Sequence, residues 1–424
     1  MQVEQQSIIC TGCGCLCDDL DVKLAQGQIQ EVANVCLWGL SRFFPIKRLH
    51  PQKERHRLLE PLWRRNGRLR QVSYTQALEL AAAILGQARR PLIYGLTNTG
   101  SWAQEAALQL ARKLKARLEP ADLAFKAPYY QSLRRHGFYW APLEVIRDEA
   151  DTVLFWGANP LHSCPRHLVR YSVFARGRFM ERGVEERQVA AVDLYRTEMA
   201  KFCRLLVQIE PRQELDLLKG VEAHLSGSAA AKPAVKGARK LAKFLSQAEF
   251  GVIFFGRGAT SRQGFAVLDT LGGLAARLGE KQTWALFPLS GDFNSQGLYH
   301  LLLNELGVPE APDFGHEGGV LTAAQPVDFG EFDAILVLGA DLFWFLPEDQ
   351  ASDLQKRQVP VVCLSPFANR TTDCSRVVLP TALAGLETAE VAYRMDGLPL
   401  VLKKLLPTAL PADRDILLDL IQAV

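Results

Sequence analysis

The chain has 424 residues, 48% of them hydrophobic, and its 49 basic and 46 acidic residues leave a formal net charge of +3. A chain of this length and apolar content can bury two or three cores, which excludes a disordered or fibrous protein. No run of 18 apolar residues indicates a membrane span, and the first ten residues lack the basic-then-apolar pattern of a signal peptide. Basic and acidic residues are interspersed, so we expect a globular cytoplasmic protein that binds neither nucleic acid nor membranes.

Cysteine is concentrated near the N-terminus, with four residues between positions 10 and 17 and a fifth, Cys36, nineteen residues later. In a cytoplasmic protein, clustered thiols are more often metal ligands than disulfides. A C-x2-C-x3-C run with a distant fourth Cys suits a cubane iron–sulfur cluster, because three thiolates hold it from one loop and the fourth closes the site. The expected ligands are Cys10, Cys13, Cys17 and Cys36, and Cys15 is expected to be a spectator.

Two other assignments of this loop stay open. Tetrahedral zinc can bind the same four thiolates, although structural zinc sites usually pair two C-x2-C motifs. A loop that holds neither metal is the third assignment. In each case Gly12 and Gly14 permit the tight turns of the loop. Alternating apolar and polar residues on both sides of Gly27 predict a hairpin that returns Cys36 to the loop.

The pattern after residue 70 is that of an α/β protein. Ser73 is expected to cap an amphipathic helix. A strand at 91–94 then ends in Gly95, and a helix capped by Ser101 and running to about Leu118 follows. Strand, glycine-containing loop and helix N-terminus form a Rossmann-type unit, in which a ligand phosphate commonly sits on free backbone N–H groups. Many α/β proteins carry such a turn without a ligand, so the loop alone does not identify one.

The same order of strands and loops occurs twice along the chain. The corresponding glycines and segments are Gly95 and Gly256, Gly157 and Gly339, 189–194 and 359–364, and 197–204 and 371–376. We therefore predict an α/β fold in which an N-terminal iron–sulfur-type Cys module at 1–60 precedes two related Rossmann-like domains at 67–225 and 238–424. The small-residue stretch 226–237 is expected to be the linker between them.

An iron–sulfur module followed by two α/β domains resembles the molybdopterin and tungstopterin oxidoreductases. Several motifs resemble, more specifically, the B subunit of formylmethanofuran dehydrogenase. These motifs are Cys10-Thr-Gly-Cys13, Cys17-Asp-Asp-Leu20, Trp156-Gly-Ala-Asn-Pro160, Pro165-Arg-His-Leu-Val-Arg-Tyr171, Leu386-Glu387 and Ala392-Tyr-Arg-Met-Asp-Gly397. The resemblance covers most of the chain and is diluted between residues 260 and 330.

The resemblance implies a 4Fe-4S cluster, a tungstopterin or molybdopterin, and reduction of CO2 to formate, which another subunit attaches to methanofuran. At the position of the family's metal-ligand Cys, however, this chain has Phe125, and Lys126 stands in place of the following His. Phe has no lone pair for a metal, and Lys relays protons near neutral pH only if its pKa is strongly lowered. Redox catalysis by a bound pterin is therefore not expected. The former pterin-cleft candidates are Gly157, Asn159, Gly339, Asp341, Arg394 and Asp396.

A relative without redox chemistry resembles this chain more closely in that respect. It is the B subunit of the formyltransferase/hydrolase complex of methylotrophic bacteria, where other subunits move formyl groups from formyl-tetrahydromethanopterin to a methanofuran analogue and release formate. This resemblance implies a non-catalytic scaffold whose partners are the other subunits. Two alternatives stay open: an active tungsto- or molybdopterin dehydrogenase with an altered metal ligand, and an electron-transfer module that uses only the cluster.

The loss of a pterin would leave a cavity that bulky side chains should fill. We expect the rings of Phe125, Trp344 and Phe345 to lie between the two domains rather than in solvent. Arg394 and Asp396 can also form an internal salt bridge in a tight turn. A last group, His162, Cys164 and His167, lacks a fourth donor and is expected to belong to a packed loop rather than to a metal site.

Overall fold

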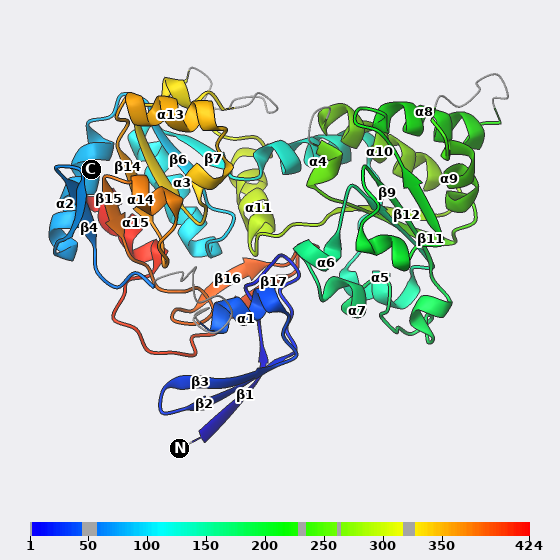
Figure 1. Cartoon of the computed structure of the whole chain (residues 1–424), viewed down its shortest axis with the longest axis horizontal. Helices are drawn as coiled ribbons and strands as arrows, with labels where there is room; N and C mark the ends of the chain where they lie inside the picture. The colour runs from blue at the N-terminus through cyan, green and yellow to red at the C-terminus, as the bar shows by residue number, and fades with distance from the viewer. Residues whose placement is uncertain (1, 45–56, 228–234, 261–263, 317–326) are drawn as a thin grey trace. The chain divides into compact units, whose positions relative to one another are not determined.

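The computed structural model describes residues 2–44, 57–227, 235–260, 264–316 and 327–424 (Figure 1). The chain forms two compact units. Unit 1 consists of Met1–Leu123, Asp292–Arg394 and Pro399–Val424, and unit 2 consists of Ala124–Gly291 and Met395–Leu398. Most of the linker expected at 226–237, namely residues 228–234, lies outside the described residues.

Unit 1 contains a seven-stranded sheet in the order β5-β4-β15-β14-β13-β6-β7, a three-stranded sheet β1-β2-β3, and the hairpin β16-β17. Its strands are β1 (Gln2–Ile8), β2 (Leu20–Ala25), β3 (Gln28–Ala33), β4 (Leu62–Arg65), β5 (Arg68–Gln71), β6 (Pro91–Gly95), β7 (Arg117–Pro120), β13 (Ala334–Leu338), β14 (Val361–Leu364), β15 (Val377–Leu379), β16 (Glu390–Tyr393) and β17 (Pro399–Leu402). Its helices are α1 (Leu37–Phe43), α2 (Tyr74–Gly86), α3 (Ser101–Leu114), α11 (Ser295–Leu306), η5 (Phe329–Glu331), α12 (Leu342–Phe345), α13 (Glu348–Lys356), α14 (Arg370–Cys374) and α15 (Asp413–Ala423).

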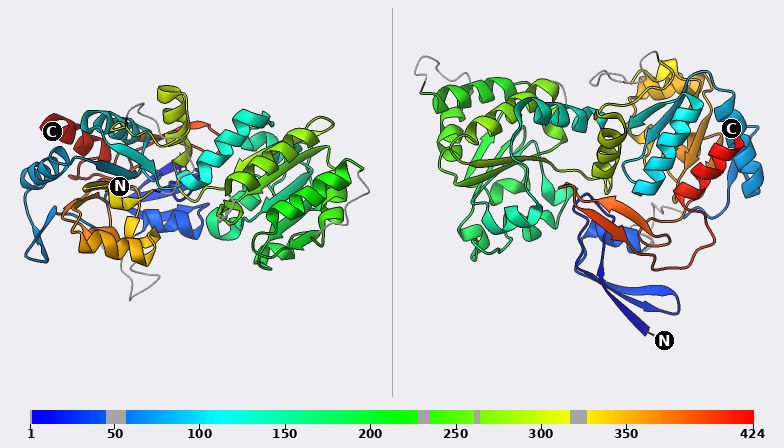
Figure 2. Two further views of the ribbon diagram at one scale, coloured as in Figure 1. Left: turned by 90° about the horizontal axis from the view of Figure 1, so that it is seen from above. Right: turned by 180° about the vertical axis from the view of Figure 1, so that it is seen from behind.

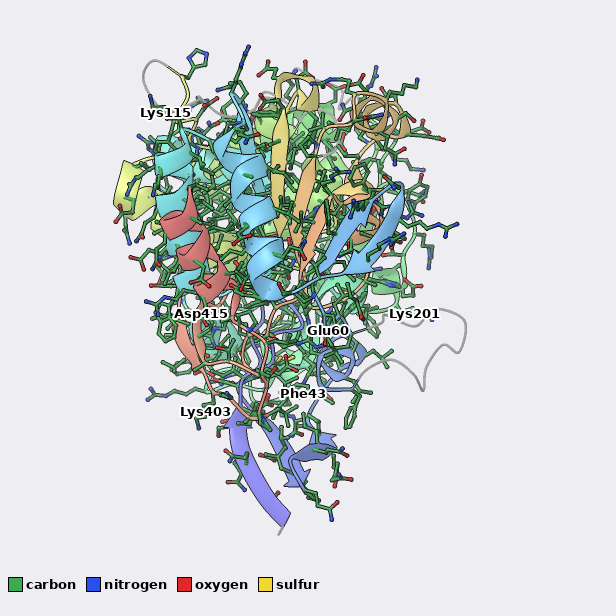
Figure 3. The ribbon with its side chains drawn as sticks, turned by 90° about the vertical axis from the view of Figure 1, so that its left-hand side faces the viewer. Phe43, Glu60, Lys115, Lys201, Lys403 and Asp415 are labelled. Atoms are coloured by element: carbon green, nitrogen blue, oxygen red, sulfur yellow. The ribbon has the colours of Figure 1, made fainter. Side chains whose placement is uncertain are left out.

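The central strands of this sheet are buried on both faces because helices cover each face. Ile93 and Leu336 point to a core shared with α2, α3, α11 and α15. Their neighbours Leu92 and Val337 point to a second core shared with α12 and α13. Figure 3 shows α2, α3 and α15 side by side over the sheet. Strands buried on both faces consist of nearly continuous apolar residues, so their positions can be predicted from the sequence.

Unit 2 is a five-stranded parallel sheet in the order β10-β9-β8-β11-β12, with helices packed around it (Figure 2). Its elements are α4 (Leu123–His136), α5 (Leu143–Glu149), β8 (Thr152–Trp156), α6 (Pro160–Ser163), α7 (His167–Arg170), η2 (Gly183–Glu185), β9 (Gln188–Asp193), η3 (Glu198–Lys201), β10 (Leu205–Gln208), α8 (Glu214–Leu225), α9 (Ala238–Leu245), β11 (Phe250–Phe255), η4 (Arg257–Thr260), α10 (Gly264–Leu278) and β12 (Thr283–Pro288).

The continuous domain boundaries expected at 67–225 and 238–424 differ from this grouping. Strands β6 and β7 pair with β13 rather than with β8, and β11 and β12 pair with β8 rather than with β13. Sequence echoes show which segments are alike, but the crossover between two paired parallel strands has no upper limit of length, so neighbours in the sheet can be far apart in the sequence. Unit 2 is therefore nested within the sequence of unit 1.

The two sheet orders place the echoed segments at matching positions. Reading β7-β6-β13-β14-β15 against β12-β11-β8-β9-β10 aligns β6 with β11, β13 with β8 and β14 with β9. Gly157 and Gly339 follow the aligned strands β8 and β13, with φ values of +53° and +63°. Gly95 ends β6 and Gly256 follows β11. All four glycines thus lie at the carboxyl ends of parallel strands.

Several local predictions are confirmed, and both expected ends of one helix are wrong. The strands β2 and β3 pair as an antiparallel hairpin that turns through Gln26 and Gly27, both with positive φ. The Ser73 side chain accepts a hydrogen bond from Gln76 N at 3.2 Å. Helix α3, however, has Gly100 rather than Ser101 as its N-cap, and it ends at Leu114 because Lys115 adopts a left-handed conformation.

No helix in the described parts of the chain is long and apolar enough to cross a membrane.

Candidate metal centre and cofactor cleft

The Cys loop is folded back on itself by backbone hydrogen bonds. Cys10 N donates to Cys17 O at 2.8 Å, and Leu16 N donates to Cys13 O at 3.1 Å. Leu16 has a φ of +39° and its side chain is fully buried. It packs with Phe293 and with residues of the hairpin β16-β17, so the apolar residue between two thiols anchors the loop.

Two glycines let the loop approach helix α1, which starts next to Cys36. A Cβ on Gly12 would lie 2.9 Å from Gly39 N, and a Cβ on Gly39 would lie 2.7 Å from Cys10 Sγ. Real Cβ atoms essentially never come so close, so both positions require glycine. Cys36 is the N-cap of α1. The hairpin β2-β3 and the first turn of α1 therefore bring the distant Cys36 to the loop.

The thiols share one buried environment. Cys10, Cys13 and Cys17 are at most 6% exposed. Burial raises the pKa of the Cys10 thiol well above its ordinary value, and the neighbouring Cys13, Cys17 and Cys36 raise it further. Thiolates at such a site need a bound cation, whose charge favours their ionised form. Gly12 N donates a hydrogen bond of 3.3 Å to Cys10 Sγ, as a thiolate ligand would require. The cysteines near the N-terminus thus suit a bound metal, and the set of four ligands stays a prediction.

Cys15 lies close to this group, since its Sγ is within 4.8 Å of Cys13 Sγ and its side chain is fully buried. The other conspicuous donors each have a contact of their own. His162 is exposed and lies 3.5 Å from Glu198. Cys164 donates to Ser290 O, whereas His167 packs edge-on against a Phe ring, and burial lowers its pKa to about 3. Cys164 and His167 are thus packed in the interior, whereas His162 is exposed to solvent.

Phe125 lies on α4 in unit 2 and is 4% exposed. Its ring centroid is 5.3 Å from that of Phe255, which in turn packs against Tyr129. The Arg257 guanidinium lies over the Phe125 ring at 6.0 Å. Lys126 is fully buried. Position 125 is thus part of an aromatic cluster, and its side chain offers no donor to a metal.

The prediction that the rings of Trp344 and Phe345 are shielded from solvent is wrong. Trp344 and Phe345 are 60% and 58% exposed. They lie on the short helix α12, whose other two residues, Leu342 and Phe343, are the buried ones. One turn of helix directs half of its side chains to the core and half to solvent, so bulk alone did not predict the direction of these rings.

Two polar residues expected in the pterin cleft, Asp341 and Asn159, form hydrogen bonds to neighbouring turns. Asp341 accepts hydrogen bonds from the backbone N–H and the hydroxyl of Thr371 at 3.0 and 2.7 Å. Its counterpart Asn159 donates to Glu198 at 3.3 Å. Asp341 and Asn159 have similar backbone angles, with φ near −110° and −120° and ψ of 89°. Each therefore links the end of one strand to the turn that follows the next strand.

The two remaining cleft candidates, Arg394 and Asp396, are each 1% exposed. Asp396 accepts a hydrogen bond of 2.8 Å from Leu143 N, the first N–H of helix α5. A carboxylate at this position is favourable because the helix dipole is positive there. The Asp396 carboxylate therefore caps the N-terminus of α5.

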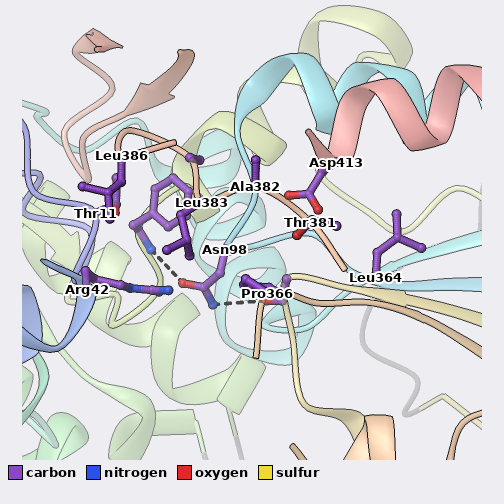
Figure 4. A pocket seen from close by; sticks show the side chains of 13 residues that line it. Thr11, Arg42, Asn98, Leu364, Pro366, Thr381, Ala382, Leu383, Leu386 and Asp413 are labelled. Atoms are coloured by element: carbon purple, nitrogen blue, oxygen red, sulfur yellow. Dashed lines mark hydrogen bonds between the residues drawn. The ribbon is translucent and has the colours of Figure 1, made fainter. Parts of the chain in front are cut away.

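A small cavity lies in unit 1 where the strand order reverses between β6 and β13. It has a volume of about 40 Å³ and is bordered by the Cys loop at Thr11, by Arg42 of α1 and by the loop after β6 at Asn98. Figure 4 shows Arg42 extending toward Asn98, whose amide donates to Gly339 O at 3.2 Å. Ligands of open α/β sheets bind at such reversals. This cavity has room for only a few water molecules.

Sequence reasoning missed Glu390, which lies against the N-terminus of α3. Its carboxylate accepts a hydrogen bond of 3.2 Å from Trp102 N, and its side chain is buried. The contact joins residues 288 positions apart, so no local pattern marks it. The one sequence signal is Gly100, where a Cβ would overlap the Glu390 carboxyl group.

The chain matches known proteins over nearly its whole length. A family model described as molybdopterin oxidoreductase matches residues 57–415. The chain is 31% identical to the B subunit of the tungsten-containing formylmethanofuran dehydrogenase 2 of Methanocaldococcus jannaschii, with 99% of this chain and 98% of that protein covered. It is 30% identical, with the same coverage, to the protein of that name from Methanococcus maripaludis.

Two solved structures share the fold. The formyltransferase/hydrolase complex FhcABCD of Methylorubrum extorquens, solved with methylofuran, has a chain with a TM-score of 0.67 and 20% identity, covering 85% of this chain and 98% of that chain. Acetylene hydratase from Pelobacter acetylenicus has a TM-score of 0.69 and 13% identity, covering 99% of this chain and 69% of that one. The fold is therefore that of the molybdopterin oxidoreductases, and the chain belongs to the family of formylmethanofuran dehydrogenase B subunits.

Proposed function

We propose that this chain is the B-type subunit of a formyl-group-processing complex of tetrahydromethanopterin- and methanofuran-linked one-carbon metabolism, and that it serves there as a non-catalytic scaffold. Its partners are the other subunits of a formyltransferase/hydrolase or formylmethanofuran dehydrogenase complex. The relatives' names support the setting. The observation that carries the scaffold role is Phe125, a buried ring in an aromatic cluster at the position of the metal ligand.

The Cys loop is proposed to hold a 4Fe-4S cluster on Cys10, Cys13, Cys17 and Cys36. The support is that Cys10, Cys13 and Cys17 are buried, that the half-buried Cys36 is near enough to raise the pKa of Cys10, and that two glycines shape the loop. Thiolates in such a place need a cation to balance their charge. When bound, such a cluster supplies one-electron transfer. The chain's own contribution is to exclude water and to orient the thiolates through the Gly12 N–H and the backbone bonds of the loop.

We also propose that the two α/β units are Rossmann-like and arose from one repeated unit. The aligned sheet orders, the positive φ of Gly157 and Gly339, and the similar angles of Asn159 and Asp341 support this relation. Units built in this way keep their cores when the chemistry between strand-end loops is lost, because the apolar strands do not depend on it. We therefore expect that both α/β units stay folded without a pterin cofactor and can still serve as a scaffold.

A second candidate function is an active tungstopterin or molybdopterin formylmethanofuran dehydrogenase subunit with altered metal ligation. The 31% identity to a tungsten-containing relative over 99% of this chain favours it. A metal in such a protein would need a donor other than the residue at position 125, such as hydroxide.

Metal and pterin analysis of the anaerobically purified complex distinguishes the two candidates. The scaffold predicts about four iron atoms and four sulfides per chain, with neither pterin nor tungsten or molybdenum, and no viologen-coupled formate oxidation. A Cys36→Ser variant should lose the iron, and a Cys203→Ser variant, altered at a half-buried thiol of unit 2, should keep it. Pterin with stoichiometric tungsten or molybdenum would establish the second candidate, and zinc without sulfide would overturn the cluster.

A further inference from the structure

The loop after β6 and the start of α3 form the arrangement that binds ligand phosphates in Rossmann-type units. Strand β6 ends at Gly95, and α3 follows with Gly100 as its N-cap and 14 residues of helix. The N–H groups of the first turn have no partners within the helix, and the helix dipole makes this end positive. An anion is therefore favoured at this point of unit 1.

The anion is supplied by the chain itself. Glu390, the first residue of β16, accepts a hydrogen bond of 3.2 Å from Trp102 N, the second N–H of the helix. Its side chain is 3% exposed. The carboxyl group fills the space beside Gly100, where even a Cβ would overlap it. A phosphate group cannot enter the same space while this carboxylate is there.

The surrounding residues hold Glu390 in this position. Val391 N donates to the same carboxylate oxygen at 3.2 Å. Further along the same strand, Tyr393 N donates to Asn294 Oδ1 at 2.8 Å. The side-chain amide of Asn294 in turn donates to Thr99 O at 2.9 Å. Strand β16 is thereby tied to the loop that precedes α3. Burial raises the pKa of Glu390, whereas the backbone N–H donors of Trp102 and Val391 oppose this shift. The positive charge of Arg414, whose guanidinium lies 5.7 Å from the Trp102 ring centroid, opposes it as well.

From these contacts we infer that Glu390 is an internal anion that takes the place of a ligand phosphate at the N-terminus of α3, and that unit 1 is closed to phosphate-bearing ligands at this point. The inference goes beyond the proposed function, because it concerns the occupant of the helix N-terminus and holds whichever metal the Cys loop binds. It also assigns Glu390 a role: the carboxylate stabilises α3 in the absence of a ligand.

Removing the carboxylate should open an anion site that inorganic phosphate can fill. The experiment compares full-length wild type with Glu390→Ala by calorimetric titration with inorganic phosphate and by thermal unfolding, in phosphate and in chloride at equal ionic strength. Wild type should show no saturable phosphate binding and the same Tm in both salts. Glu390→Ala should have a lower Tm in chloride, recover part of the loss in phosphate, and bind phosphate at least about tenfold more tightly than wild type.

Two further variants separate the proposed role from the loss of a negative charge elsewhere near α3. Glu305→Ala removes an exposed carboxylate that pairs with Arg112 in the last turn of α3, and its Tm should not depend on phosphate. Glu390→Gln keeps an oxygen acceptor for Trp102 N and fills the same space, so it should bind no phosphate.

Equal phosphate binding by wild type and Glu390→Ala, or no binding by a folded Glu390→Ala, would overturn the inference. If Glu390→Ala does not fold, wild-type crystals soaked in phosphate decide the matter. An anion on Trp102 N with Glu390 displaced would refute the internal anion, and an unchanged Glu390 would support it. Neither result depends on the metal and pterin content that tests the proposed function.

Discussion

At the scale of single residues, Phe125 carries the proposed scaffold role. Its ring is buried against Phe255 and lies beneath the Arg257 guanidinium. An aromatic residue in such a place cannot ligate a metal, but it fills the volume that a smaller ligand residue would leave open. Position 125 has thus become part of the packing of unit 2.

Replacing Phe125 by Ala should lower the free energy of unfolding by roughly 3–5 kcal/mol, because the substitution removes a buried ring and leaves a cavity. Urea denaturation followed by circular dichroism measures the loss. Trp344→Ala is the matched control, since that ring is 60% exposed, and we expect a change within about 0.5 kcal/mol. A loss below about 1 kcal/mol for Phe125→Ala would show that the site collapses around a smaller residue. We also expect that Phe125→Cys does not restore tungsten or molybdenum binding.

Asp413 gives a residue-scale prediction about pH. Burial and, to a smaller extent, the negative charge of Glu390 raise its pKa to about 7, although Thr381 and Arg57 oppose the shift. Figure 4 shows the Asp413 carboxyl group directed toward Thr381. The folded pKa lies above the ordinary value of 3.8, so the folded chain holds a proton that the unfolded chain releases between these pH values. This contribution to stability is therefore complete below pH 4 and is lost as the pH rises to about 7.

Asp413→Asn should remove that part of the pH dependence, because the amide resembles the protonated acid and does not titrate. The wild-type free energy of unfolding should fall more steeply than that of the variant between pH 5 and pH 7, by up to about 1.4 kcal/mol per pH unit. Urea titrations at several pH values measure both slopes. Glu119, whose burial also raises its pKa to about 7, titrates in both proteins and cancels in the comparison. Parallel curves would mean that Asp413 stays ionised in the folded chain.

At the scale of secondary-structure elements, the sequence predicted those parts whose pattern is local. The hairpin β2-β3, the Ser73 cap and the strands that end in glycine follow from alternation, capping and turn chemistry within a few residues. The same local pattern indicated that the loop before α3 resembles a phosphate-binding turn, without identifying a ligand. It could not show that Glu390 lies at the N-terminus of α3, because Glu390 belongs to a strand 288 positions away from its hydrogen-bond donor Trp102.

The approach of the Cys loop to α1 is another element-scale feature, and it depends on glycine at position 39. Gly39→Ala would place a Cβ 2.7 Å from Cys10 Sγ and 2.6 Å from the Val35 side chain. We expect the loop to be pushed away from α1, so that Cys36 no longer meets the other thiols. Iron content after anaerobic reconstitution should fall several-fold.

Gly86→Ala is the control for this change, since a Cβ there meets only Val424, at an ordinary 3.9 Å. Iron content should not change in that variant, and helix α2 should be slightly more stable. Full iron content in Gly39→Ala would contradict the assignment of Cys36 to the same site as Cys10.

At the scale of the whole molecule, the sequence did not allow us to predict which segments of the chain combine into each unit. The echoes between 189–194 and 359–364 correspond to β9 and β14, which hold matching positions in the two sheets. They do not say that β6 and β7 join β13 across an insertion as long as unit 2. That pairing is decided by long-range burial of apolar strands, for which a single sequence contains no direct signal.

The cores of unit 1 are also separate from the Cys loop, which leads to the last prediction. The two large cores are built from the seven-stranded sheet and its helices, and none of the nine cysteines except Cys363 and Cys374 contributes to them. The loop is anchored instead through the small cluster around Leu16. Removal of the metal should therefore loosen the N-terminal module and leave the α/β cores folded.

Cys36→Ser is the variant that tests this independence. We expect it to lose its metal and to become sensitive to limited proteolysis within the first 44 residues, while the main thermal transition of the chain shifts by no more than a few degrees. Cys363→Ser gives the opposite control: that thiol is fully buried in a core of the sheet, so the variant should keep its metal but unfold at a lower temperature. If Cys36→Ser abolished the main transition, the metal would be a folding determinant of the entire chain, as it is in small zinc domains, and a scaffold role without the cluster would be ruled out.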